Sequence, residues 1–401
     1  MSCDWCFLLN FLSLSRYAWE ERKLGELSNI VGGGTQSTSN PEYWDGDIDW
    51  YAPAEIGEQS YVSKSKKTIT ELGLKKSSAR ILPVGTVLFT SRAGIGNTAI
   101  LAKEATTNQG FQSIVPDQNK LDSYFIFSRT NELKRYGEVT GAGSTFVEVS
   151  GKQMSKMSIM VPELSEQQKI GSFFKQLDDT IALHQRKLDL LKEQKKGFLQ
   201  KMFPKNGAKV PELRFAGFAD DWEERKLKDI AQFNPKTVLP DEFEYVDLES
   251  VVGTEMISHR TESKDQAPSR AQRLAQKGDV FYQTVRPYQM NNYLYDLPYD
   301  NYVFSTGYAQ MRPNIDSYFL LNSVQNKQFV QHVLDRSTGT SYPAINSSDL
   351  SNIEIHVPSK LSEQQKIGAF FQQLDETIAL HQRKLDLLKE QKKGFLQKIF
   401  V

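Results

Sequence analysis

The sequence predicts an α+β protein with two similar globular domains, separated by two long helices that pair as an antiparallel coiled coil. A 40-residue segment at residues 164–203 recurs at residues 361–400 with only four differences. Both copies carry an apolar heptad pattern, which is typical of a coiled-coil seam. The rest of the chain mixes short β-branched and short helical segments and lacks the β-α-β spacing of a nucleotide-binding sheet.

The seam residues follow one another in alternating steps of four and three. Two near-identical helices in one chain can bury such seams against each other; packing on their own domains, or dimerisation between chains, are the alternatives. Lys195 and Lys392 also fall on the seam, and with the two histidines they are expected to form polar layers that set the register. The expected seam is Ile170, Phe174, Leu177, Ile181, His184, Leu188 and Leu191, repeated as Ile367, Phe371, Leu374, Ile378, His381, Leu385 and Leu388.

The ends of the helices carry recognisable signals. Ser165 and Ser362 are expected as N-caps, with Gln168 and Gln365 as their capping-box partners, and Pro204 ends the first helix. Each helix would be roughly 55–60 Å long at about 1.5 Å per residue.

Other helix residues lie outside the seam. Asp178 and Asp179 are interpreted as solvated surface charges. Four leucines at c positions are candidates for docking another subunit: Leu183, Leu190, Leu380 and Leu387.

Shared landmarks extend the duplication to the domains. WEERKLGEL at residues 19–27 matches WEERKLKDI at 222–230, and Asp-Ser-Tyr-Phe at 122–125 recurs at 316–319, where each copy is expected to open a short helix. Because the helices are nearly identical and the domains are not, the helices serve one role twice and the domains serve variants of one role. The predicted parts are an atypical segment 1–18, a first domain 19–160, a helix 164–203, a linker 204–212, a second domain 213–358 and a helix 361–401.

Composition describes an ordinary chain and excludes several classes of protein. The 401 residues have a formal net charge of zero and are 39% hydrophobic. Cys3 and Cys6 alone make a poor zinc site, no signal peptide or apolar run of membrane-spanning length is present, and a cytoplasmic location is expected. No P-loop, G-x-S-x-G, H-E-x-x-H or complete adenine-methyltransferase motif occurs. The sequence therefore favours binding over catalysis, with no metal and no cofactor in this chain.

Local charge and side-chain chemistry indicate where DNA would bind. Residues 61–103 hold eight basic side chains against one acidic side chain, Glu71, which suits phosphate contacts; a merely solvated face is the alternative. The matching part of the second half is richer in Arg, Asn and Gln, which can hydrogen-bond base edges. The candidate DNA contacts are Thr35, Gln36, Lys64, Lys66, Lys67, Lys75, Lys76, Arg80, Ser91, Arg92, Asn97, Asn108, Gln109, Arg270, Arg273, Thr284, Arg286, Tyr288, Gln289, Asn291 and Asn292.

Taken together, the tandem LSEQQKIG…LLKEQKKGFLQ helices, the WEERKL openings and the GTVLFTSR and NQGF landmarks resemble the specificity subunits of type I restriction–modification enzymes, over about residues 19–401. The resemblance implies a non-catalytic subunit whose two domains each recognise one half of a bipartite double-stranded DNA target. It implies that the helices space the domains and dock two methyltransferase subunits, which methylate adenine, and that restriction subunits join the complex.

S-adenosylmethionine, ATP and magnesium are then expected in the partner subunits. The alternative function is a structural coiled-coil adaptor without sequence-specific DNA contact. One departure from the family pattern is the start of the chain: VPELRFAGFADDWEERKL at residues 210–227 follows it, whereas residues 1–18 do not.

Overall fold

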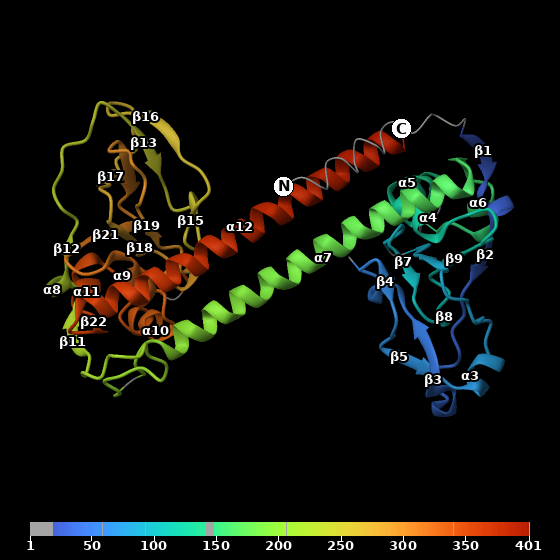
Figure 1. Ribbon diagram of the computed structural model, residues 1–401, viewed down its shortest axis with the longest axis horizontal. Coiled ribbons are helices and arrows are strands. Elements are labelled where there is room, and N and C mark those ends of the chain that lie inside the picture. The colour runs from blue at the N-terminus through green and yellow to red at the C-terminus, as the bar shows by residue number, and fades with distance from the viewer. Residues whose placement is uncertain are drawn as a thin grey trace. The chain divides into compact units, whose positions relative to one another are not determined.

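The computed structural model describes residues 19–400 except 58, 93, 142–147, 206 and 340, and the chain divides into two compact units. Unit 1 comprises Met1–His184 and Leu385–Val401, and unit 2 comprises Gln185–Lys384. The division falls within two long helices, α7 (Leu164–Lys201) and α12 (Leu361–Ile399), so each unit contains part of both (Figure 1).

Unit 1 combines three small sheets with short helices. A five-stranded sheet has the order β2-β9-β6-β7-β4, a three-stranded sheet has the order β5-β3-β8, and β1 pairs with β10. Its strands are β1 (Glu20–Lys23), β2 (Ser28–Gly32), β3 (Trp44–Tyr51), β4 (Tyr61–Val62), β5 (Lys67–Ile69), β6 (Val87–Phe89), β7 (Thr98–Leu101), β8 (Thr106–Thr107), β9 (Gln112–Pro116) and β10 (Ser158–Val161). Its helices besides the long pair are α2 (Leu24–Leu27), η1 (Pro41–Tyr43), η2 (Pro53–Glu55), α3 (Glu71–Lys75), α4 (Ser123–Ser128), α5 (Thr130–Gly141) and α6 (Gly151–Ser155).

Unit 2 repeats this architecture with different loops. Two four-stranded sheets have the orders β12-β21-β18-β19 and β16-β13-β20-β17, and β11 pairs with β22 and β14 with β15. The strands are β11 (Glu223–Lys226), β12 (Ala231–Phe233), β13 (Glu242–Val246), β14 (Val251–Val252), β15 (Glu255–Met256), β16 (Arg260–Ser263), β17 (Ala271–Leu274), β18 (Val280–Gln283), β19 (Tyr293–Leu294), β20 (Tyr302–Ser305), β21 (Tyr308–Pro313) and β22 (Glu354–Val357). The helices are α8 (Leu227–Ile230), η3 (Pro287–Gln289), α9 (Ser317–Val324), α10 (Lys327–Asp335) and α11 (Ser347–Ser351).

The short opening strands are equivalent in the two units. β1 pairs antiparallel with β10, and β11 pairs antiparallel with β22, in the same register: Glu20 faces Val161 and Glu223 faces Val357. As predicted, the repeated Asp-Ser-Tyr-Phe sequence opens α4 and α9. The side chains of Asp122 and Asp316 accept from the third amide of each helix, both at 2.8 Å. The landmarks therefore mark the shared framework of the two units.

The long helices run antiparallel within each unit. In unit 1, Lys392 Nζ lies 2.5 Å from Asp178 Oδ1, and Phe173 contacts Phe395. In unit 2, Lys195 Nζ lies 2.6 Å from Asp375 Oδ1. In unit 1 the contact partner moves from residue 395 to residue 392 of α12 as the position on α7 moves from residue 173 to residue 178. The two helices are therefore antiparallel. The predicted fold class is confirmed.

These ion pairs correct the interpretation of Asp178 as a solvated charge and support the prediction of polar layers at Lys195 and Lys392. Asp178 is not a solvated charge, because its side chain is only 12% exposed and pairs across the helices. Its copy Asp375 has a pKa raised by burial, an effect that the Lys195 ammonium opposes. The two lysines therefore form polar layers in the seam, each with an aspartate of the opposite helix.

The starts of the long helices differ from the prediction. The helices begin at Leu164 and Leu361, so the serines expected as N-caps lie inside the first turn. The buried amide of Gln167 instead accepts from Asp122 N and donates to the carbonyls of Lys120 and Pro162. Gln364 repeats this arrangement with Asp316 and Pro358. A clamp to the neighbouring loop replaces the capping box.

Gly171 allows α7 to approach the cap of α4 closely. A Cβ at this position would lie 2.3 Å from Asp122 Oδ1. We expect Gly171→Ala to destabilise the chain by roughly 1–3 kcal/mol, because the cap must shift. Gly394→Ala is the matched control in the same unit, since its Cβ would meet nothing within 4 Å. It should stabilise helix α12 by up to about 1 kcal/mol. Denaturant unfolding measures both, and equal effects would contradict the close-approach argument.

Candidate nucleic-acid interface

The basic segment of unit 1 forms an exposed cationic surface, which we define as the basic patch. It lies on β5, α3 and the adjoining loops, on the side of unit 1 away from α7 (Figure 1). Lys75 Nζ lies 3.8 Å from the carboxylate of Glu71, which is also exposed. All six members are exposed: Lys64, Lys66, Lys67, Lys75, Lys76 and Arg80.

Carboxylate side chains hold the backbone of the basic patch by hydrogen bonds, while the basic side chains are exposed. Asp49 Oδ1 accepts from both the amide and the hydroxyl of Ser65, at 2.7 Å each. Glu55 Oε2 accepts from the Lys66 amide at 2.6 Å. Lys67 Nζ lies 5.4 Å from the Trp44 ring centre. Acidic side chains are thus used on the backbone, which leaves the ammonium groups available to phosphates.

The two candidate DNA contacts in the glycine-rich loop beside this patch differ in exposure. Thr35 is exposed and hydrogen-bonds the side chain of Gln109, which is also exposed. Gln36 is only 2% exposed, and neither amide atom of its side chain has a partner among the described residues. Gln36 was predicted to contact DNA, but burial prevents this contact in the present conformation.

The remaining candidates of unit 1 also separate by exposure. Ser91 is fully buried, so this candidate DNA contact is not accessible in this conformation. Arg92 lies 4.0 Å from Glu148 and is partly exposed. Asn97 is exposed, whereas Asn108 Oδ1 accepts from Gly110 N and fixes the turn. Asn97 and Arg92 remain accessible to a ligand.

In unit 2 the candidates gather on a strained loop around η3. Arg286 and Met290, which flank η3, both have positive φ, at 54° and 57°. Non-glycine residues rarely adopt this conformation, and such strain is often found at binding sites. The guanidinium of Arg286 lies 4.5 Å from the ring centre of Tyr342, which is 64% exposed. Tyr288 is 50% exposed.

An amide network holds this loop in place. The side-chain Nε2 of Gln283 donates to Gln289 Oε1 at 2.9 Å, and the backbone N–H of Gln283 donates to Asn292 Oδ1 at 2.8 Å. Asn291 Oδ1 accepts from Gly253 N. Asn292 and Thr284 are 1% and 8% exposed, so both are framework residues and are not accessible as the predicted DNA contacts.

The last two candidates of unit 2 are arginines at β17. Arg270 is exposed. Arg273 is half-buried, burial lowers its pKa, and its Nε has no partner among the described residues. Arg270 and the η3 loop thus provide the accessible donors of unit 2.

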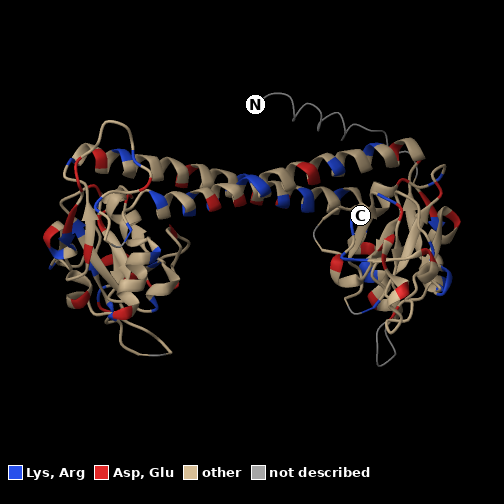
Figure 2. Ribbon diagram, turned by 90° about the horizontal axis from the view of Figure 1, so that it is seen from below, with Lys and Arg blue, Asp and Glu red and all other residues tan. Residues whose placement is uncertain are grey.

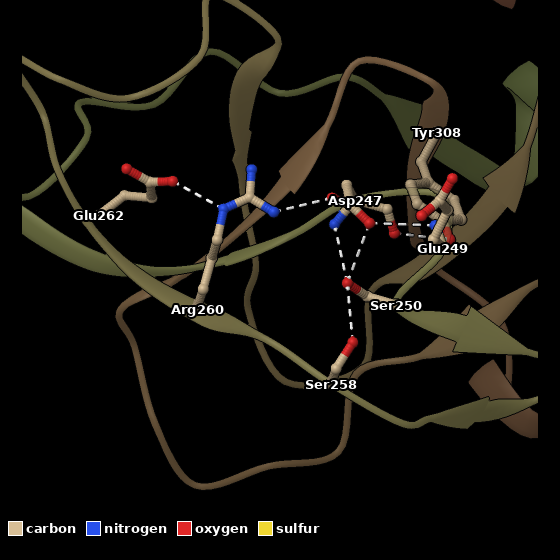
Figure 3. Close-up of polar contacts among 7 residues, drawn as sticks. All are labelled: Asp247, Glu249, Ser250, Ser258, Arg260, Glu262 and Tyr308. Carbon is tan, nitrogen blue, oxygen red and sulfur yellow. Dashed lines mark hydrogen bonds and ion pairs between the residues drawn. The ribbon is translucent and has the colours of Figure 1, made fainter.

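Two exposed residues near these candidates were missed by the sequence analysis. Arg260 donates to Asp247 and Glu262, at 2.9 and 2.7 Å (Figure 3). Its guanidinium also lies 4.7 Å from the Tyr245 ring centre. Tyr342 stacks with Arg286 but belongs to a loop without a landmark. Nothing in the local sequence distinguishes these two from ordinary loop residues, because the contacts come from distant strands and loops.

The Asp247 carboxylate organises the loop around Arg260. It also accepts from Ser250 Oγ and Glu249 N, at 3.1 and 3.0 Å (Figure 3). Burial raises the pKa of Asp247, but these hydrogen bonds and that from Arg260 outweigh burial and lower it. The carboxylate therefore stays ionised and fixes the arginine.

Acidic and basic residues are interspersed along the ribbons of the long helices (Figure 2). Against this background the four c-position leucines are 58–60% exposed. In unit 1 the Asp178–Lys392 pair sets a register that places Leu183 at the level of Leu387. In unit 2 the Lys195–Asp375 pair places Leu190 at the level of Leu380. Each unit thus presents two exposed leucines at one level of its helix pair.

None of the described helices has the length and apolar composition needed to cross a bilayer.

Residues 17–193 and 219–390 match one family model, the type I restriction modification DNA specificity domain. A specificity subunit of the type I restriction enzyme MjaIX from Methanocaldococcus jannaschii is 36% identical over 178 residues, covering 44% of this chain and 41% of the relative. The specificity subunit of the type I restriction enzyme EcoR124I/EcoR124II from Escherichia coli is 30% identical over 175 residues, covering 42% of this chain and 43% of the relative. The chain thus matches less than half the length of these two relatives.

Longer matches occur at lower identity. The specificity subunit of MjaVIII from M. jannaschii is 21% identical over 397 residues, covering 94% of this chain and 91% of the relative. A crystal structure of a type I restriction–modification S subunit from M. genitalium superposes with a TM-score of 0.64 at 14% identity, covering 98% of both chains. This similarity concerns the fold.

Proposed function

Because the chain belongs to the type I restriction–modification DNA specificity family, we propose that each of its two units recognises one half of a split double-stranded DNA sequence. The observation that carries the proposal is one framework built twice with different surfaces. Both units share the opening strand pair, the capped helix and the glutamine clamp. Their accessible loops differ: unit 1 offers the basic patch, and unit 2 offers arginines, amides and tyrosines.

Both surfaces suit DNA in different ways. Lysines supply sequence-independent phosphate contacts, whereas Arg, Asn and Gln can hydrogen-bond base edges in the major groove. In unit 1 the accessible polar candidates Thr35, Asn97 and Gln109 would complement the basic patch. In unit 2 this role falls to Arg270, Arg286, Tyr288 and Gln289. The domain limits 19–160 and 213–358 remain part of the proposal.

The chain itself is non-catalytic in this proposal and directs partner subunits to the DNA. Two methyltransferase subunits would use S-adenosylmethionine to methylate adenine in each half-site, and restriction subunits would use ATP and magnesium. The long helices would fix the gap between the half-sites. Each is a continuous element of 38 or 39 residues, which is about 57 Å at 1.5 Å per residue.

The methylation pattern of cells tests this function. Cells that carry this gene and its methyltransferase partner are expected to gain methylated adenines in one split motif with a constant gap. Cells with the partner gene alone are the control. If single-molecule sequencing showed no new split motif, the specificity function would be wrong.

The exposed leucines are proposed to dock the methyltransferase subunits. We expect Leu183→Glu with Leu387→Glu to reduce association with the methyltransferase by tenfold or more, since a charge replaces apolar contact area. The thermal stability of the isolated chain should change little, because these side chains are already 58–60% exposed. Analytical ultracentrifugation of the mixed subunits measures the association. Undiminished association of this variant would exclude docking at these leucines.

A further inference from the structure

One glutamate occurs at equivalent positions of the two long helices but has different partners. In unit 2, the side chain of Glu363 is only 2% exposed and pairs with Arg214. Arg214 Nε donates to Oε1 at 2.7 Å, and Nη2 donates to Oε2 at 2.9 Å. Both carboxylate oxygens are therefore satisfied by one guanidinium, and these bonds raise the pKa of Arg214.

The arginine belongs to a segment that lies along the start of α12. Its Phe215 ring contacts Phe370, with centres 6.0 Å apart. The ammonium of Lys366 lies 5.0 Å from the ring centre of Phe218. The first turns of α12 thus form a receptor for residues 210–221, with the Glu363 carboxylate as its most buried contact.

In unit 1 no arginine of the described residues binds the equivalent glutamate. Glu166 occupies the position of Glu363, and its Oε1 accepts from the Trp19 indole at 3.3 Å. Its Oε2 is buried and has no hydrogen-bond partner among the described residues. In unit 2 the equivalent indole, that of Trp222, makes no hydrogen bond within the described chain. A buried carboxylate oxygen without a donor is unfavourable, so a hydrogen-bond donor at this oxygen would be stabilising.

The sequence explains the difference. Arg214 lies eight residues before Trp222, whereas Phe11 lies eight residues before Trp19. The receptor helix itself is retained, since Lys169 repeats Lys366 and is exposed. The receptor is therefore duplicated while the arginine-bearing segment is not.

We propose that unit 1 contains a binding site for an arginine-bearing segment of the Pro-Glu-Leu-Arg-Phe type, supplied by a separate polypeptide chain. Glu166 binds the guanidinium through both oxygens, as Glu363 does in unit 2, and the Trp19 indole releases Oε1. Phe173, the copy of Phe370, then contacts the phenylalanine that follows the arginine. Lys169 faces a phenylalanine four residues after the arginine, as Lys366 faces Phe218. This site requires no DNA and is independent of the proposed function.

A synthetic peptide with the sequence of residues 210–221 tests the site on the full-length chain. We expect saturable binding of one peptide per chain in isothermal titration calorimetry. A peptide with alanine in place of the arginine should bind about tenfold or more weakly, because a charge-assisted pair is lost. Glu166→Gln should weaken binding of the original peptide to a similar extent.

Glu363→Gln is the matched control, because it changes the same position of the other receptor. It should leave peptide binding to unit 1 intact. Absence of saturable binding to the unaltered chain would overturn the proposal, as would equal binding to the Glu166→Gln variant. Loss of binding in Glu363→Gln but not in Glu166→Gln would place the peptide in unit 2 and would also refute the site.

Discussion

Reversal of the basic patch is expected to weaken DNA binding on the order of a thousandfold at about 0.1 M salt. The variant changes five exposed lysines to glutamate: Lys64, Lys66, Lys67, Lys75 and Lys76. Each lysine that neutralises a phosphate contributes about 0.9 to the slope of log affinity against log salt concentration. If all five make such contacts, the slope should decrease by about 4–5. Fluorescence anisotropy with a labelled duplex, measured over a salt series, gives both quantities.

The control for this variant must change charge without touching the basic patch. The double variant Lys152→Glu with Lys156→Glu meets this requirement. Both lysines are exposed residues of unit 1: Lys152 lies in α6, and Lys156 is the C-cap of α6. We expect this control to lower affinity by less than about tenfold, through the general field of the protein alone. The coiled-coil adaptor alternative predicts that neither variant changes DNA affinity. A five-lysine variant that binds DNA as tightly as the unaltered chain would therefore favour the adaptor.

Much of the fold could be predicted because its signals are local. The heptad steps identify the seam, whose Phe174 and Phe371 are fully buried, because helix periodicity alone determines which side chains share a face. The short helices could be predicted from Asp122 and Asp316, because each aspartate caps its helix by accepting from the backbone N–H three residues later. The Asp178–Lys392 pair was missed, since a seam-flanking aspartate looks like any surface charge until the opposite helix is in register.

The candidate site was predicted less well, since accessibility depends on packing between distant segments. Gln36 and Asn292 have the side chains that can recognise adenine, yet both are buried in the folded chain. The exposure of Lys64 and Lys66 was easier to predict, because a lysine remains exposed at almost any position in a loop. Arg260 could not be identified, because Tyr245 on β13 and Asp247 in the loop after β13 contact it only once β13 and β16 are paired. Charge was therefore predictable from sequence, and hydrogen-bonding geometry was not.

Arg214→Ala is expected to destabilise unit 2 by roughly 3–5 kcal/mol, since it leaves the Glu363 carboxylate buried and unpaired. Glu166→Gln is the internal comparison and should change stability by less than about 1 kcal/mol, because its Oε2 has no partner to lose among the described residues. Equilibrium unfolding in urea measures both variants. A second variant separates charge from packing: Arg214→Met with Glu363→Leu should recover most of the loss, because apolar pairs can replace a buried ion pair. If Arg214→Ala and Glu166→Gln had equal effects, the two receptors would be equally occupied, and the difference between the units would lie elsewhere.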